Sequence, residues 1–227
     1  MIEHILPAKA ASAEAFSDPS GVWLFPEETE AVARAVDKRR REFTTARSCA
    51  RQALARLGFD AVPVPRGPGG APQWPDGVAG SITHCSGYRA CAVARTRDVA
   101  SVGIDAEPNE ATPKGVLGAV SDTGERERLA GLPAGRGAHW DRLLFSAKES
   151  VYKAWYPLTG RWLGFEDASI SIDPERESFT ARLRVPGPVA FDRRHDVFKG
   201  RWIIRDGLIA TAVCITSEED GKNPTHR

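Results

Sequence analysis

Two long segments of the chain carry apolar residues at the spacing of a buried helix face. The first runs from about residue 27 to residue 57, opens with proline and two acids, and is expected to break near Asp37. The second runs from about residue 139 to residue 156, and we expect Pro157 to end it. The buried stripes are Phe43, Ala46, Ala50, Leu54 and Leu57 in the first helix, and Trp140, Leu144, Ala147, Val151 and Trp155 in the second.

Shorter apolar runs between turn residues predict strands, whereas residues 1–25 and the segment 60–80, rich in proline and glycine, are expected to be irregular. An Asp-Gly pair at 206–207 is a strong hairpin signal. The strands are expected at 90–94, 100–107, 168–172, 179–185, 202–204 and 208–215.

Helical material followed by several strands occurs twice along the chain. This order predicts an α+β protein with two similar halves, residues 1–107 and 108–227, joined near the turn-rich segment 108–113. The polar residues from about 217 onwards are expected to form a frayed tail.

Composition narrows the class of protein without defining its function. Of the 227 residues, 41% are hydrophobic and 27% are charged, which is typical of a soluble globular protein. A net charge of +1 argues against general binding of nucleic acid. No apolar run approaches the ~20 residues of a membrane helix, and the first residues do not resemble a secretory signal. Four cysteines without a C-x-x-C pair indicate reduced thiols in a cytoplasmic protein.

The first candidate site for chemistry is residues 103–107, G-I-D-A-E. Asp105 and Glu107 lie two apart on a predicted strand and therefore share one face. Oxygen ligands alone suit a hard cation such as Mg²⁺. Considered without context, the pair is better explained as two solvated acids at a turn.

The second candidate lies on the second helix, in residues 145–155, F-S-A-K-E-S-V-Y-K-A-W. Glu149 faces away from the apolar stripe and is a third metal ligand or a general base. Lys153, one turn later, is placed to meet a phosphate. The alternative is an ordinary Glu–Lys pair on a solvated helix face, worth a few tenths of a kcal/mol.

A third group of residues has the chemistry of a phosphate site. His84 and Thr83 belong to S-I-T-H-C at 81–85, and Arg66 precedes a glycine-rich turn. Several arginines around one pocket suit a ligand with two or three phosphates, although a solvated basic helix face is the better explanation for most of them. The basic residues of the first helix are Lys38, Arg39, Arg40, Arg41, Arg47 and Arg51.

Together these motifs, in this order, resemble the 4′-phosphopantetheinyl transferases. The resemblance is to the larger branch associated with surfactin and enterobactin synthetases, and within it to the actinobacterial members, and it covers roughly residues 20–215. R-S-C-A-R, W-P-D-G, G-I-D-A-E-P and H-W-D-R-L-L-F-S-A-K-E also carry it. The family implies two similar α+β halves with the active site in the cleft between them. It also implies transfer of phosphopantetheine from coenzyme A to a serine of an acyl or peptidyl carrier protein, with adenosine 3′,5′-bisphosphate as the other product.

The resemblance further implies roles for individual residues. Mg²⁺, or Mn²⁺ in its place, would bind the pyrophosphate of coenzyme A. Lys153 would meet that pyrophosphate or help to activate the serine, and Glu107 or Glu149 would accept the serine proton. Ala106 offers only its backbone carbonyl, so that a water would fill the place of a missing side-chain ligand. The metal ligands would be Asp105, Glu107 and Glu149, and the coenzyme A contacts Arg39, Arg47, Arg66, Thr83, His84 and Lys153.

Two other functions are compatible with these residues. One is a non-catalytic module that binds coenzyme A or a carrier, and the other is a metal-dependent phosphohydrolase. The acids and Lys153 are all present, which favours the transferase. The sequence leaves open which carriers of polyketide, nonribosomal-peptide or fatty-acid synthases are used, and it predicts a monomer, because the cleft forms within one chain.

Overall fold

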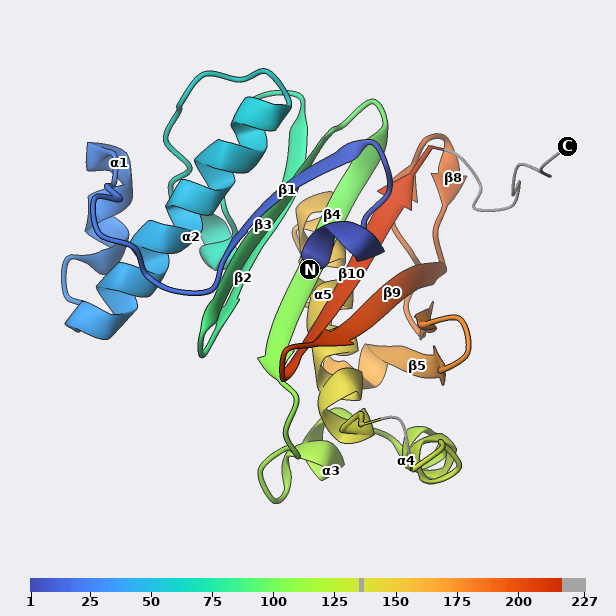
Figure 1. Ribbon diagram of the computed structural model, residues 1–227. Coiled ribbons are helices and arrows are strands. Elements are labelled where there is room, and N and C mark those ends of the chain that lie inside the picture. Colours follow the sequence, from blue (N-terminus) through green and yellow to red (C-terminus); the bar gives the residue numbers. More distant parts are fainter. Residues whose placement is uncertain (135–136, 218–227) are drawn as a thin grey trace, which may run out of the picture.

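The computed structural model describes residues 1–134 and 137–217 (Figure 1). The first half of the chain contains η1 (Ile2–Ile5), β1 (Ala10–Ala15), α1 (Pro26–Thr29), η2 (Glu30–Val32), α2 (Asp37–Arg56), η3 (Pro68–Gly70), β2 (Val78–Cys85), β3 (Tyr88–Arg95) and β4 (Val99–Pro108). The second contains α3 (Val116–Val120), α4 (Thr123–Ala130), α5 (Trp140–Thr159), η4 (Phe165–Asp167), β5 (Ala168–Asp173), β6 (Ser178–Leu183), β7 (Val189–Ala190), β8 (Arg193–Arg194), β9 (Val197–Arg205) and β10 (Leu208–Thr216).

The described chain forms two α+β halves, as the sequence predicts. The smaller sheet has the order β1-β3-β2 and packs against α2, whereas the larger sheet has the order β4-β10-β9-β6-β5 and packs against α5. All pairings in both sheets are antiparallel. Within the described residues no helix combines the length and the apolar character needed to cross a membrane.

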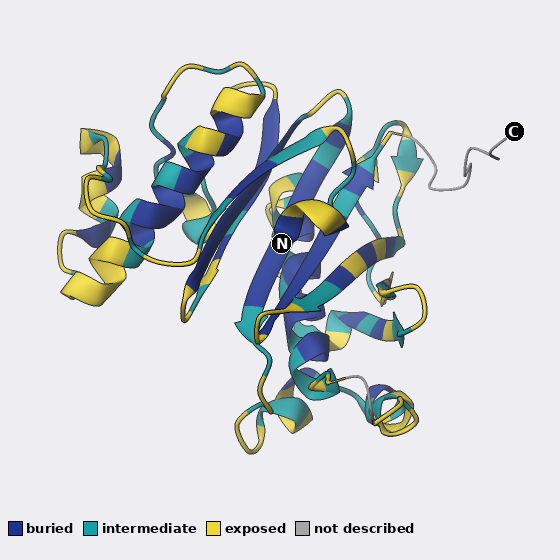
Figure 2. Ribbon diagram, in the orientation of Figure 1, coloured by how far each residue is buried: buried dark blue, intermediate teal, exposed yellow. Residues whose placement is uncertain are grey.

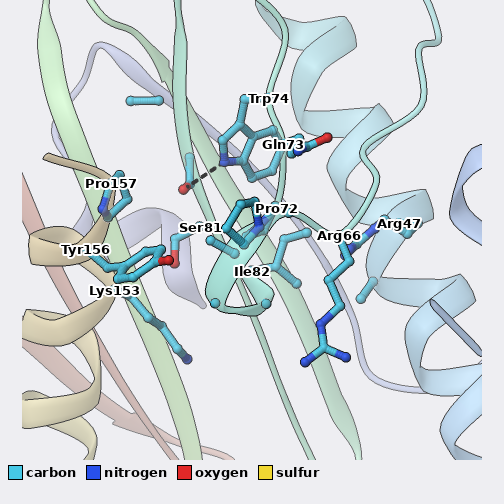
Figure 3. Close-up of a pocket in the computed structure, with 18 of the residues that line it drawn as sticks. Arg47, Arg66, Pro72, Gln73, Trp74, Ser81, Ile82, Lys153, Tyr156 and Pro157 are labelled. Atoms are coloured by element: carbon cyan, nitrogen blue, oxygen red, sulfur yellow. Dashed lines mark hydrogen bonds between the residues drawn. The ribbon is translucent and has the colours of Figure 1, made fainter. Parts of the chain in front are cut away.

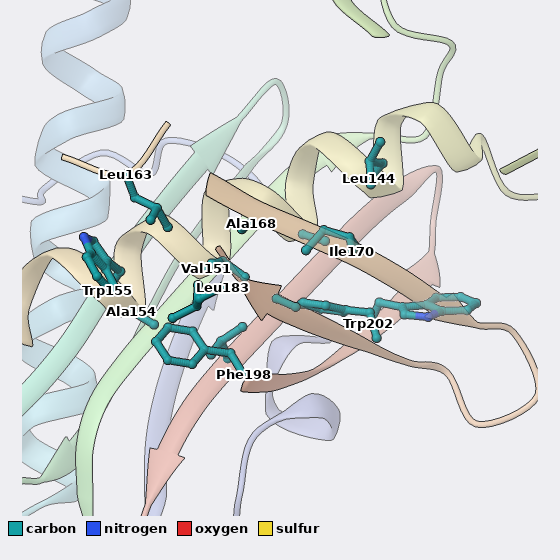
Figure 4. Close-up of a cluster of buried hydrophobic side chains, with 14 of the residues drawn as sticks. Leu144, Val151, Ala154, Trp155, Leu163, Ala168, Ile170, Leu183, Phe198 and Trp202 are labelled. Atoms are coloured by element: carbon teal, nitrogen blue, oxygen red, sulfur yellow. The ribbon is translucent and has the colours of Figure 1, made fainter. Parts of the chain in front are cut away.

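Hydrophobic cores lie where each long helix meets its sheet. Figure 2 shows α2 and α5 buried on the sides that face the strands. Around α5, Leu144, Val151 and Trp155 pack with Phe198 and Trp202 of β9 (Figure 4). On α2 the predicted stripe is buried at Phe43, Ala46, Ala50 and Leu54, with Leu57 partly buried. Both amphipathic helices predicted from the sequence are therefore confirmed.

One end of each long helix was predicted explicitly, and the structure confirms only one of the two. The predicted break near Asp37 is confirmed, because α2 begins at that residue after two short turns. The predicted stop at Pro157 is wrong: α5 continues to Thr159 and ends at Gly160, whose φ is 63°. Pro157 removes only one backbone hydrogen bond of α5. Because it lies in the last turn, the helix can continue for two more residues without it.

Residues 10–15, which we expected to be irregular, form β1. Their sequence, A-A-S-A-E-A, lacks the β-branched residues typical of strands, but it pairs in register with β3 from Ala10 opposite Ala94 to Ala15 opposite Arg89. The pairing partner, which local sequence does not reveal, therefore makes this segment a strand. For the same reason β2, which pairs with β3, was only partly predicted. The helices α3 and α4 were also missed, although Asp122 and Glu125 form a capping box at the start of α4, which is a local signal.

The Asp206-Gly207 turn is confirmed. Both residues have positive φ values, 52° and 74°, as a two-residue hairpin between β9 and β10 requires. This hairpin continues into the pairing of β10 with β4, where Thr211 lies opposite Asp105. The turn thus helps to fix the register of the strand that carries the predicted acids.

Side-chain hydroxyls join the two sheets at their facing edges. The backbone N–H of Ile104 donates to Ser81 Oγ at 3.1 Å, and that of Ala106 donates to Thr83 Oγ1 at 3.0 Å. β4 thus pairs with β10 while contacting β2, and the boundary after residue 107 stays a proposal. The predicted tail lies almost wholly in residues 218–227, outside the described residues.

Candidate active site

Asp105 lies at the junction of the two halves, buried beside α5. Its Oδ1 is 2.7 Å from Lys153 Nζ and accepts a longer bond, of 3.4 Å, from the Thr83 hydroxyl. Lys153 Nζ also donates to the carbonyl oxygen of Ile104 at 3.1 Å. The other carboxylate oxygen, Oδ2, is buried and has no hydrogen-bond partner among the described residues. A buried oxygen of this kind can accept a further donor or a cation.

The two glutamates are electrostatically coupled to Asp105. Burial raises the pKa of Glu107, the charge of Asp105 raises it further, and Arg142 opposes both effects. Burial also raises the pKa of Glu149, with Asp105 adding to the rise and Lys153 opposing it. The negative charge of Asp105 thus reaches both glutamates, and all three carboxylates lie where little solvent screens their charges.

Two of the three acids are paired with cations. Asp105 pairs with Lys153, and Glu107 Oε2 lies 3.0 Å from Arg142 Nη1. Over the described residues, no three His, Cys, Asp or Glu side chains form a group that could hold a metal ion. The convergence of Asp105, Glu107 and Glu149 on one ion therefore stays a prediction.

A pocket of about 700 Å³ lies beside these acids (Figure 3). Its walls come from α2, the loop 66–74, β2 and α5. Glu149 and Lys153 reach it from α5, while Asp105, Glu107 and Thr83 are not among the residues that line it. Six of the predicted functional residues line this single pocket: Arg39, Arg47, Arg66, His84, Glu149 and Lys153.

Arg47 is a buried cation in the wall of the pocket. Its guanidinium carbon lies 4.1 Å from the centre of the Phe43 ring, and its Nε has no hydrogen-bond partner among the described residues. The loss of solvent lowers the pKa of Arg47 to about 10, so the side chain is still charged at neutral pH. An incompletely satisfied guanidinium favours an anion, because unmet donors and an unpaired charge are costly when buried.

A second cationic group lies at the end of β2. Arg39 contacts His84 Nε2 and lies 4.0 Å from Glu42. Loss of solvent around the ring lowers the pKa of His84, and the Arg39 charge lowers it further. His84 is therefore mostly neutral near pH 7, with one ring nitrogen able to donate and the other to accept.

Two motif residues, Thr83 and Lys148, make buried contacts within the fold instead of lining the pocket. The Thr83 hydroxyl is buried against β4, so its predicted contact with coenzyme A stays a prediction. Lys148 points away from the pocket, and its Nζ donates to buried Glu125 at 3.0 Å and to the carbonyl oxygens of Phe165 and Ala168. Lys148 therefore stabilises the fold, whereas its neighbour Glu149 lines the pocket.

Sequence reasoning missed three residues of this region. Arg142, which pairs with Glu107, lies in the H-W-D-R motif, and Tyr156 follows the last motif on α5. Trp74 comes from W-P-D-G and donates from Nε1 to the Gly80 carbonyl at 3.0 Å, in the pocket wall. The motifs contained the first and the last of these, but nothing local indicated their partners.

Comparison with known proteins assigns the chain to a family. Residues 27–94 match the 4′-phosphopantetheinyl transferase N-terminal domain, and residues 101–212 match the 4′-phosphopantetheinyl transferase superfamily. The chain is 57% identical over 222 residues to the 4′-phosphopantetheinyl transferase Svp of Streptomyces mobaraensis, covering 96% of this chain and 90% of the relative. The chain belongs to the 4′-phosphopantetheinyl transferase superfamily.

Two further relatives support the same assignment. The 4′-phosphopantetheinyl transferase Npt of Nocardia iowensis is 49% identical over 221 residues, with 94% of this chain and 99% of the relative covered. The 4′-phosphopantetheinyl transferase PptT of Mycobacterium tuberculosis is 46% identical over 224 residues, with 95% and 98% covered. The predicted resemblance to actinobacterial transferases is confirmed, and the protein transfers phosphopantetheine to carrier proteins.

Proposed function

We propose that the pocket binds coenzyme A and presents it to a serine of an apo acyl or peptidyl carrier protein. The serine Oγ attacks the β-phosphorus, the bond to the adenosine bisphosphate breaks, and holo carrier and adenosine 3′,5′-bisphosphate leave. The observation that carries this proposal is Arg47, a buried guanidinium with an unpartnered Nε in the pocket wall. The nucleotide of coenzyme A supplies the phosphates that such a group favours.

In this proposal, different basic residues of the pocket contact different phosphate groups of coenzyme A. Arg47 and His84 meet the region of the 3′-phosphate, and Arg39 and Arg66 lie near the nucleotide. Lys153 meets the pyrophosphate or helps to activate the serine. Their charges stabilise the negative charge that develops on the phosphoryl oxygens during transfer.

The acidic residues fit a divalent cation by their chemistry. The unpartnered Oδ2 of Asp105 and the carboxylates of Glu107 and Glu149, whose pKa values its charge raises, supply the kind of oxygen donors that suit Mg²⁺ or Mn²⁺, and they would have to converge to hold the ion. We propose that Asp105, Glu107 and Glu149 hold this ion, with Ala106 contributing only its backbone carbonyl. When bound, the ion adds positive charge next to the reacting phosphates.

The carrier serine must lose a proton as it attacks. Glu107 and Glu149 both have raised pKa values, which make their carboxylate oxygens better proton acceptors than an exposed glutamate. Either of them accepts the proton in this proposal. Separate substitutions compared over a pH series distinguish the two.

The decisive experiment mixes the purified protein with apo carrier protein, coenzyme A and Mg²⁺ and measures intact mass. The carrier is expected to gain the mass of one phosphopantetheine group. A module that only binds coenzyme A leaves the carrier mass unchanged. A phosphohydrolase consumes coenzyme A without any carrier, and either result overturns the proposal.

A matched pair of variants tests the acidic site. Glu149→Gln keeps the size and helix propensity of the side chain and is expected to slow transfer by at least ~10²-fold. Excess Mg²⁺ restores part of the rate if Glu149 is a ligand, but not if it is the base. Glu127→Gln, on the exposed surface of α4, is the control and is expected to keep the wild-type rate. Near-normal transfer by Glu149→Gln at low Mg²⁺ would contradict the three-carboxylate site.

Cellular location and assembly complete the proposal. All four cysteines lie in the described residues and none of them forms a disulfide there, and burial raises the pKa of Cys49 to about 11. Thiols kept in this form suit a reducing compartment, so we place the protein in the cytoplasm as a monomer. Its partners are the carrier proteins or carrier domains of polyketide, nonribosomal-peptide or fatty-acid synthases.

A further inference from the structure

Part of the loop between α2 and β2 is stabilised by backbone hydrogen bonds within the loop. In residues 66–73, here called the strap, the N–H of Gly67 donates to the carbonyl oxygen of Ala71 at 2.8 Å. At its far end the N–H of Gln73 donates to the carbonyl oxygen of Pro65 at 2.9 Å. These bonds make the strap a compact unit whose residues line one side of the pocket.

The tip of the strap rests on α5. A Cβ built on Gly69 would overlap the hydroxyl of Tyr156, and it would lie 2.6 Å from Cζ of the same ring. Gly69 also has a φ of 65°, which other residues adopt with strain. Tyr156 extends from α5 toward Pro72 of the strap in Figure 3. Glycine at this position therefore permits direct backbone contact with the tyrosine.

Gly70, the next residue of the strap, contacts the side chain of Arg66. A Cβ on Gly70 would lie 3.0 Å from Nη2 and 3.1 Å from Nε of Arg66, so the guanidinium lies against the bare backbone of this glycine. Gly70 has a φ of 84°, again in the region that favours glycine. A continuous line of contacts thus runs from Tyr156 through Gly69 and Gly70 to Arg66.

We propose that Tyr156 is a positioning residue that acts through the strap on Arg66. The tyrosine hydroxyl supports the tip of the strap, and the strap holds the Arg66 guanidinium at the pocket, ready for a phosphate group of a nucleotide. The inference rests on the proposed function, because it assigns Arg66 to the same phosphate-bearing ligand. Tyr156 contributes to affinity without touching a phosphate itself.

Calorimetric titration of coenzyme A tests this with a double-mutant cycle. Arg66→Ala is expected to weaken coenzyme A binding about tenfold or more, because it removes a charge-assisted hydrogen bond. Tyr156→Leu is expected to weaken binding by a similar factor. The double variant is expected to bind no more weakly than the weaker single variant, because both substitutions remove the same interaction.

Two glycine variants separate positioning from backbone strain. Gly69→Ala forces the strap and the Tyr156 ring apart and is expected to weaken coenzyme A binding as Tyr156→Leu does. Gly21→Ala is the matched control, since Gly21 has a φ of 83° with no atom within 4 Å of a built Cβ. Its coenzyme A affinity is expected to equal that of the wild type. Thermal unfolding of every variant identifies any that fail to fold, and Tyr156→Phe then replaces Tyr156→Leu as the milder substitution.

The outcomes discriminate between the two proposals. If the losses of Arg66→Ala and Tyr156→Leu multiply, or if Tyr156→Leu binds coenzyme A like the wild type, this inference is overturned and the proposed function stands. A wild-type protein that binds no coenzyme A overturns the proposed function and this inference with it.

Discussion

Gly103 of β4 packs directly against the backbone of Ser150 in α5. A Cβ on Gly103 would overlap the Ser150 carbonyl oxygen and would lie 2.6 Å from the amide nitrogen of Ala154. Two residues earlier on the same strand, Ser101 Oγ donates to the Ala154 carbonyl at 2.7 Å. This close approach brings the strand that carries Asp105 next to the helix that carries Glu149 and Lys153.

Gly103→Ala is therefore expected to destabilise the protein by about 1–3 kcal/mol or more, because an added methyl group forces β4 and α5 apart. Urea unfolding measures the loss. Gly118→Ala is the control, since Gly118 lies in α3 with open space around a built Cβ, and it is expected to be neutral or stabilising by up to about 1 kcal/mol. Equal unfolding midpoints for Gly103→Ala and the wild type would contradict the packing argument.

Arg47→Ala is expected to raise the KM for coenzyme A roughly 10- to 150-fold, the cost of losing a charge-assisted hydrogen bond. The KM for the carrier protein is expected to change little. Arg41→Ala, an exposed arginine on the same helix, is the control. Steady-state kinetics with each substrate varied in turn provides the measurement. An unchanged coenzyme A affinity in Arg47→Ala would make Arg47 a structural residue of α2.

Coenzyme A binding is expected to take up a proton at His84. The pKa of His84 is lowered from 6.5 by loss of solvent and by Arg39, so the ring is mostly neutral in the free protein at pH 7. A bound phosphate favours the protonated ring and raises that pKa. Affinity is therefore expected to fall as the pH rises from about 6 to 8, by at most tenfold per unit.

Calorimetry in two buffers with different ionisation enthalpies measures the proton uptake directly. His84→Gln is expected to lower the uptake and flatten the pH dependence. Protons taken up by the phosphates of coenzyme A contribute equally to both proteins. Subtracting the proton uptake of the variant from that of the wild type therefore leaves the contribution of His84. Equal proton uptake by both proteins would show that His84 does not change its charge on binding.

Lys148→Met is expected to cost about 3–5 kcal/mol, because it leaves the buried Glu125 carboxylate without its counter-charge. Glu125 would keep a bond of 2.8 Å from the Ile170 N–H, which cannot neutralise it. The double variant Glu125→Gln with Lys148→Met is expected to be more stable than Lys148→Met alone. Denaturant unfolding of both variants checks this, and the reverse order of stabilities would contradict it.

Local sequence patterns were sufficient for the parts of the fold that depend on local interactions. The stripe of α5 and the Asp206-Gly207 turn follow from helical periodicity and from backbone preferences. β1 was missed because its strand character depends on β3, which is distant in sequence. The end of α5 was misplaced because a proline in the last turn does not stop a helix.

For the candidate site, residue types could be predicted but their partners could not. Motif residues such as Arg47 and Glu149 line one pocket, and their roles there stay predictions. The pairing of Lys153 with Asp105 depends on the approach of β4 to α5, and the pairing of Arg142 with Glu107 depends on the start of α5. Sequence spacing contains no information on either distance.

The hydroxyls of Ser81 and Thr83 also protect the protein against unwanted association. β4 is an outer strand of the larger sheet, and N–H groups that face outward from such a strand, here those of Ile104 and Ala106, are donors that can recruit a strand from another molecule when they are left unpaired and open. The two hydroxyls accept these hydrogen bonds, so this edge does not offer them for strand addition. Together with the packing of β2 against β4, these bonds leave the strand that carries Asp105 no open donor at either position for edge-to-edge pairing.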